Sequence, residues 1–116
     1  MNGLPSILEE RRSTERCVLT IRVDNENPWF QGHFPGFPIL PGVVQIGWAE
    51  HYACMLYGLD GGIATLEQIK FRRPILPGME LTLVLRLDLA LHKLRYEYRD
   101  AEASYSSGIL NFRVDA

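Results

Sequence analysis

Hydrophobic and polar residues alternate along several stretches of the chain, and a period of two predicts β-strands with one buried face. The expected strands cover residues 17–23, 63–72, 81–91, 93–99 and 104–114. In the third of these, leucine takes every second position, which predicts one long strand with six leucines on a single face. In the last, Leu110, Phe112 and Val114 are expected to share a buried face. The carboxyl-terminal half of the chain is therefore expected to be mainly β-structure.

One stretch lacks this alternation and is apolar around most of a helical circumference. Residues 43–57 contain no proline and no turn pair, which predicts a helix that is buried on nearly all sides. Gly58 follows it as a helix-terminating glycine. Residues 24–42 are rich in glycine and proline and are expected to form an ordered loop. Residues 1–16 carry mixed charge and are expected to be a lead-in, with one helical turn around residues 7–11.

These elements predict a single α+β domain over residues 1–116. An antiparallel sheet can bury one face and leave the other in water. The one helix must then lie against the apolar face. The expected architecture is a curved antiparallel sheet wrapped around one central helix. A domain of this size buries a limited share of its surface, so we also expect an oligomer.

Composition and charge exclude some classes of function. The net charge of −2 gives no general attraction to nucleic acid or to anionic membranes. No apolar run reaches the roughly 18 residues needed to span a bilayer, and there is no apolar leader, so we expect a cytoplasmic protein. Cys17 and Cys54 match no metal or redox spacing, and we expect both to be buried thiols. Neither a metal nor a cofactor is expected.

The densest motif lies in the glycine- and proline-rich loop. Its residues are His33, Phe34, Pro35, Pro38, Pro41 and Gly42. This spacing resembles the active-site segment of bacterial 3-hydroxyacyl-[acyl-carrier-protein] dehydratases of the FabZ and FabA kind, and residues 70–78 resemble the family's second landmark. Residues 45–48 resemble the ApeI-like dehydratases of aryl polyene gene clusters.

The resemblance implies a hot-dog fold over roughly residues 17–114. It implies dehydration of 3-hydroxyacyl groups on acyl carrier protein to trans-2-enoyl thioesters, in biosynthesis of the fatty-acid or aryl-polyene type. It also implies a homodimer, with a higher oligomer or a hetero-oligomer with another hot-dog chain as alternatives.

The implied reaction removes a proton from C2 and hydroxide from C3. His33 is the expected base, because its ordinary pKa is near neutral. The amide of Gly42, unpaired at the positive end of the helix, suits the enolate charge that develops on the thioester carbonyl. We expect His33 to face a narrow apolar tunnel at the dimer interface, lined by residues 39–44 and the partner's helix. The resemblance implies contact with the acyl chain at Phe34, Pro41, Val43 and Gly47.

The family's second catalytic residue is missing from this sequence. It is an Asp or Glu on the central helix, fourteen positions after the histidine, and that position is Gly47 here. Glu50 lies three residues further on the same helix face and is the expected substitute acid. His51 is a second candidate for that role. Alternatively, partners at the dimer interface hold Glu50 and His51, and Gly47 makes room for a bulky acyl chain or for the partner helix.

Other functions stay open. A hot-dog thioesterase would need a water-activating carboxylate in the same region, and the His33 motif argues against it. A non-catalytic or partner-dependent subunit, which binds acyl carrier protein and relies on a second hot-dog chain for the acid, is favoured by Gly47. Without any acid, the chain would be a slow dehydratase, an isomerase using His33 alone, or a carrier binder. Lys70, Arg72 and Arg73 are candidates for contact with an acidic carrier protein, or are a solvated face.

Overall fold

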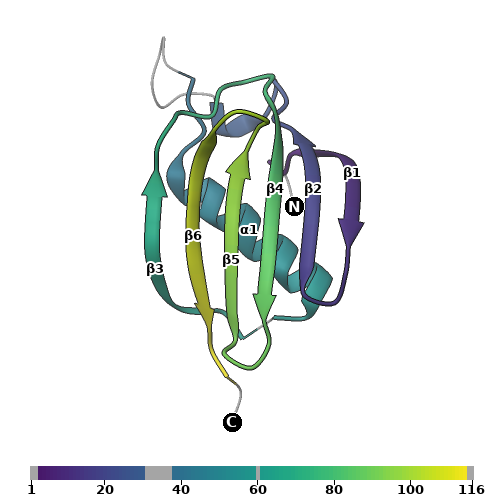
Figure 1. Ribbon diagram of the computed structural model, residues 1–116. Coiled ribbons are helices and arrows are strands. Elements are labelled where there is room, and N and C mark those ends of the chain that lie inside the picture. The colour runs from purple at the N-terminus through teal and green to yellow at the C-terminus, as the bar shows by residue number, and fades with distance from the viewer. Residues whose placement is uncertain (1–2, 31–37, 60, 115–116) are drawn as a thin grey trace.

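An antiparallel sheet curves around one helix (Figure 1). The computed structural model describes residues 3–30, 38–59 and 61–114. The elements are β1 (Ser6–Arg12), β2 (Arg16–Arg22), the short 3-10 helix η1 (Pro28–Phe30), α1 (Gly42–Tyr57), β3 (Ile63–Phe71), β4 (Glu80–Asp88), β5 (Lys93–Arg99) and β6 (Ser104–Phe112). The strand order is β1-β2-β4-β5-β6-β3, with each neighbouring pair antiparallel. The expected α+β architecture is confirmed.

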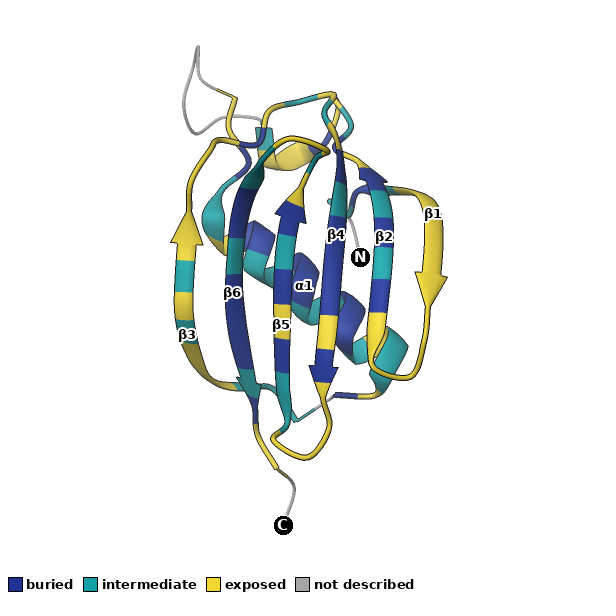
Figure 2. Cartoon of the chain, in the orientation of Figure 1, coloured by how far each residue is buried: buried dark blue, intermediate teal, exposed yellow. Residues whose placement is uncertain are grey.

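The face of the sheet that is turned toward α1 forms the core (Figure 2). The register places Cys17 of β2 and Tyr96 of β5 on either side of Leu85 of β4, and all three are buried. The predicted alternation is confirmed over the central strands, where the buried residues include Leu81, Leu83, Leu85, Leu87, Leu94, Tyr96, Tyr98 and Leu110. Burial also raises the pKa of the Cys17 thiol.

The leucine repeat runs past the end of its strand. Leu89 and Leu91 are 58% and 62% exposed, because β4 ends at Asp88 and the chain turns there toward β5. The Leu91 amide donates to Oδ1 of Asp88, and His92 takes a positive φ of 50°. The prediction of six leucines on one face is therefore wrong for the last two. Val114 is likewise exposed rather than buried, because β6 ends at Phe112.

The prediction of a helical turn around residues 7–11 is wrong, because these residues belong to β1. This strand pairs with β2 along the edge of the sheet, from Ser6 opposite Arg22 to Arg12 opposite Cys17. Most of its side chains are exposed, so it has no buried face to produce an alternating pattern. Its backbone is instead held by the hydrogen bonds of the neighbouring strand.

Helix α1 is buried on the side that packs against the sheet. The buried side chains are Val44, Gln45, Trp48, Ala49, Tyr52 and Ala53. Val43 and Met55 are 78% and 65% exposed, so the expectation of burial on nearly all sides is wrong for this chain by itself. The helix ends as predicted at Gly58, which has a φ of 68° and donates its amide to the Cys54 carbonyl. Cys54 is only partly buried, and its Sγ donates to the Leu59 carbonyl.

Candidate functional site

The candidate site is described from Pro38 onward. His33 and Phe34 lie outside the described residues, so their predicted roles stay predictions. The described part comprises the segment that leads into α1, the first turns of the helix and the end of β3. These three pieces meet at one end of the sheet (Figure 1).

The amino-terminal end of α1 has no side-chain cap. Pro41 is the N-cap residue, with φ −59° and ψ 145°, and it offers no side-chain hydrogen bond. Its carbonyl accepts the amides of Val44 and Gln45, at 3.1 and 3.2 Å. The amides of Gly42 and Val43 have no acceptor among the described residues. Both amides lie at the positive end of the helix dipole, and the predicted role of the Gly42 amide stays a prediction.

A hollow of about 350 Å³ lies beside this helix end. It is lined by Ile39, Leu40, Gly42, Gln45, Phe71, Arg72, Arg73 and Pro74. The Phe71 ring lies so close to Gly42 that a Cβ placed there would be 2.6 Å from Cζ of the ring. Any larger residue at position 42 would require the Phe71 ring, which is 54% exposed, to move.

Gly47, which stands where the family has a carboxylate, has open space around it. A Cβ built on Gly47 would meet nothing within 4 Å. Glu50 is partly exposed, and its carboxylate makes no hydrogen bond or ion pair with the described residues. His51 packs edge-to-face on Tyr52, with ring centroids 5.1 Å apart. Glu50 thus has freedom to reach beyond its own chain, whereas the His51 ring lies against a buried neighbour.

Gln45 is a site residue that the sequence reasoning missed. Its side chain is buried, and it makes hydrogen bonds with Leu40 and Ser106. The sequence signal was weak. A lone glutamine in an apolar helix indicates burial with polar partners only when those partners are known, and Ser106 is 61 residues away.

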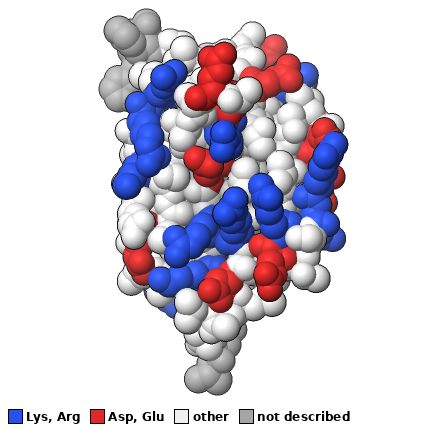
Figure 3. All heavy atoms as spheres, viewed as in Figure 1, with Lys and Arg blue, Asp and Glu red and all other residues white. Residues whose placement is uncertain are grey.

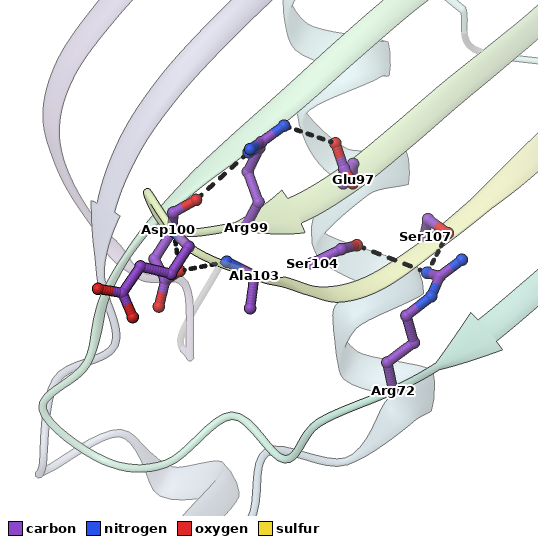
Figure 4. A network of polar contacts seen from close by, with 8 residues as sticks. Arg72, Glu97, Arg99, Asp100, Ala103, Ser104 and Ser107 are labelled. Carbon is purple, nitrogen blue, oxygen red and sulfur yellow. Dashed lines mark hydrogen bonds and ion pairs between the residues drawn. The ribbon is translucent and has the colours of Figure 1, made fainter.

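Arg72, one of the basic residues that follow β3, has a structural role. Arg72 donates to Oγ of Ser107 at 3.0 Å and to Oγ of Ser104 at 3.5 Å (Figure 4). A hydrogen bond from Tyr105, backbone amides and the charge of Arg73 hold the pKa of Asp100 below its usual value. Lysine and arginine side chains gather along this edge of the molecule and again lower on the sheet's outer face (Figure 3).

Comparison with known proteins decides the family. The family model described as ApeI-like, the ApeI dehydratase, matches residues 9–109. The chain belongs to the ApeI-like family. Among the described residues of this ApeI-like chain, no three His, Cys, Asp or Glu side chains gather to hold a metal ion. None of its described helices has the length and apolarity to cross a membrane.

Solved structures place the ApeI-like chain firmly in the hot-dog fold. It is 32% identical to a chain of the dehydratase heterocomplex ApeI:P from Xenorhabdus doucetiae, with a TM-score of 0.87, over 94% of this chain and 98% of that one. It is 34% identical to an uncharacterised protein of Erwinia carotovora subsp. atroseptica, with a TM-score of 0.80, over 95% and 96% of the two chains.

Curated relatives of the ApeI-like chain are FabZ dehydratases. The FabZ 3-hydroxyacyl-[acyl-carrier-protein] dehydratase of Alkaliphilus metalliredigens is 38% identical over 95 residues, which is 76% of this chain and 62% of the relative. The match to FabZ of Geobacter metallireducens covers 51% of that relative. The chain thus spans between about half and two thirds of the length of these curated relatives.

Proposed function

We propose that this chain is a dehydratase of 3-hydroxyacyl groups carried on acyl carrier protein. The product is a trans-2-enoyl thioester, in biosynthesis of the fatty-acid or aryl-polyene type. The observation that carries the proposal is the start of α1, where the amides of Gly42 and Val43 have no acceptor among the described residues and lie beside a hollow. Family membership supports it, because the relatives named above are dehydratases.

The chemistry assigns one task to each group. His33 takes the proton from C2, and the electron pair of that bond becomes the C2–C3 double bond. The bond from C3 to oxygen breaks, and hydroxide leaves with a proton as water. Negative charge develops on the thioester oxygen during this process, and donors aimed at that oxygen lower the barrier. The amides of Gly42 and Val43 are those donors, while Phe34, Pro41 and the space at Gly47 receive the acyl chain.

The proton for the departing hydroxide comes from Glu50. Helical side chains lean toward the amino-terminal end of the helix, so Glu50 extends toward the space beside Gly47. No described residue holds the carboxylate in place. In a homodimer formed through the exposed face of α1, this carboxylate serves the partner's His33. General acid assistance is typically worth about 10²–10⁴ in rate.

An absorbance assay tests the proposal. Purified protein is mixed with a 3-hydroxyacyl carrier substrate, and the rise in enoyl absorbance is followed. Wild-type protein should turn over, and His33→Ala should not. Glu50→Gln should lose about 10²–10⁴ in rate and keep its fold, whereas Glu26→Gln, on an exposed loop, should match wild type. Gly47→Asp should restore activity to Glu50→Gln, because it returns a carboxylate to the family's position and its Cβ would meet nothing within 4 Å.

A partner-dependent subunit is the second candidate function, and two observations favour it. Gly47 supplies no carboxylate, and the solved relative from Xenorhabdus doucetiae is a heterocomplex. In this case the chain alone is inactive, and turnover appears when a second hot-dog chain with a helix carboxylate is added. If neither the chain alone nor the mixture produces enoyl thioester, the dehydratase proposal is wrong.

A further inference from the structure

Gln45 is a buried polar residue in the first turns of an otherwise apolar helix. It is 3% exposed and faces the sheet. Burying an amide without hydrogen-bond partners costs free energy, so a residue of this kind needs partners that satisfy it. Gln45 also lines the hollow beside the start of α1, so its hydrogen bonds can affect the candidate site.

Three hydrogen bonds connect Gln45 to three different parts of the chain. Nε2 donates to the Leu40 carbonyl at 3.1 Å, before the helix. Oε1 accepts from Oγ of Ser106, on β6, at 2.5 Å. The backbone carbonyl of Gln45 accepts from the Tyr98 hydroxyl, on β5, at 2.6 Å. Burial raises the pKa of Tyr98 well above its ordinary value, so this hydroxyl remains a donor near neutral pH.

Leu40 is consequently held at both of its backbone groups. Its amide donates to the Ile75 carbonyl at 2.9 Å, and its carbonyl accepts from Gln45. The next residue, Pro41, has its φ fixed by the pyrrolidine ring. The next peptide carries the amide of Gly42. Three features therefore determine the direction of the Gly42 amide. The Leu40 carbonyl is hydrogen-bonded, the φ of Pro41 is fixed, and α1 is hydrogen-bonded to the sheet.

We infer that Gln45 is a positioning residue, which fixes the amides of Gly42 and Val43 in the orientation that receives the substrate carbonyl. The inference rests on the proposed function, because it assigns those amides to the thioester oxygen. Donors that stabilise a developing charge work best when they are already in place. A displacement of about 1 Å at a reacting centre can cost about 100-fold in rate.

Tyr98 provides the matched control, because its hydrogen bond reaches the same residue but not Leu40. Tyr98→Phe removes one bond between α1 and the sheet and leaves the Gln45 side chain in place. Gln45→Met keeps the length of the side chain and removes both of its hydrogen bonds. Gln45→Met leaves the buried Leu40 carbonyl without the donor from Gln45, and Tyr98→Phe removes a second hydrogen bond from the Gln45 carbonyl, so both should lose stability. Only Gln45→Met releases the Leu40 carbonyl.

The kinetic test compares kcat and KM for these two variants, in whichever assembly is active for wild type. Gln45→Met should lower kcat about 10- to 100-fold with KM within about threefold, because ground-state contacts are kept. Tyr98→Phe should keep kcat within about threefold despite its lower stability. The inference is wrong if the two variants lower kcat equally, or if Gln45→Met changes KM alone. Ser106→Ala, which loosens Gln45 without replacing it, should give a loss between the two and decides the matter if Gln45→Met does not fold.

A second measurement does not depend on activity. Amide proton and nitrogen shifts of Gly42 and Val43 are recorded by NMR for wild type and for each variant. Gln45→Met should shift both resonances, while Tyr98→Phe should leave them close to wild type. If wild type shows no turnover either alone or with a second hot-dog chain, the proposed function fails, and the NMR result still decides whether Gln45 holds these amides. Unchanged Gly42 and Val43 resonances in Gln45→Met would overturn the inference.

Discussion

The two faces of α1 are made from one apolar stretch of sequence, yet they have different surroundings. On the side toward the sheet, Trp48 and Ala53 are 1% and 0% exposed. On the other side, Val43 is 78% exposed, and the space at Gly47 is open. The first face is the core of this subunit. The second is apolar surface that its own described residues leave uncovered, which is typical of an interaction site.

The largest expected effect tests the covered face. Trp48→Ala should lower the free energy of unfolding by about 3–5 kcal/mol, because it empties a large volume in a packed core. Urea unfolding measures the loss. Trp29→Ala is the control, because the indoles of Trp29 and Trp48 both donate to the Gly3 carbonyl, but Trp29 is 37% exposed. A loss as large in Trp29→Ala would mean that the bond to Gly3, rather than burial, makes Trp48 important.

The next effect concerns two neighbouring tyrosines under the same face. Tyr98→Phe should cost about 0.5–1.5 kcal/mol, because it removes a buried hydrogen bond to the Gln45 carbonyl, which keeps its bond within the helix. Tyr96→Phe should be neutral or slightly stabilising, since the buried Tyr96 hydroxyl has no partner among the described residues. Burial raises the pKa of Tyr96 to about 12, so the hydroxyl is neutral at the pH of the experiment. Equal losses in urea unfolding would contradict this assignment.

Gly47→Ala tests the uncovered face. Alanine in mid-helix is favoured over glycine by about 0.8–1 kcal/mol, and its Cβ would meet nothing within 4 Å. The variant should therefore unfold at higher urea concentration. Gly58→Ala is the opposite control and should lose about 1 kcal/mol, because Gly58 has a φ of 68°. If Gly47→Ala instead weakens self-association in sedimentation, a partner helix packs against Gly47.

The smallest change in subunit stability is expected at Val43. Val43→Ser should alter the free energy of unfolding of the subunit by no more than about 0.5 kcal/mol, because the side chain is 78% exposed. It should nevertheless weaken a dimer formed through the uncovered face, as measured by sedimentation at micromolar concentration. Leu91→Ser, at a hairpin residue that is 62% exposed, should leave the mass unchanged. Identical masses for wild type and both variants would place the interface elsewhere.

The fold was predictable wherever a pattern is local. The alternation in residues 17–23 and the unbroken apolar run of residues 43–57 located β2 and α1 to within about one residue. The prediction failed at β1, which has no buried face, and at Leu89, where a turn without glycine or proline interrupts the repeat. In both places, pairing with another strand decides where the strand lies or ends. Periodicity indicates only which residues share a face, so it does not reveal this pairing.

The candidate site divides in the same way. The spacing from Pro38 to Gly42 located the helix start, and the lack of a carboxylate at Gly47 was visible from the sequence. The space around Gly47 and the contact between Phe71 and Gly42 were not, because they depend on chain that is distant in sequence.

Sequence alone therefore determined the helix, the central strands and the Pro41-Gly42 junction, because propensity and periodicity act over a few residues. Only the tertiary structure decided which face of α1 is covered and what Gln45 holds. Its partners Tyr98 and Ser106 are 53 and 61 residues away. A glutamine in a helix has the same local preferences whether it faces water or a serine on a distant strand. Burial alone makes the difference, and burial is a property of the whole folded chain.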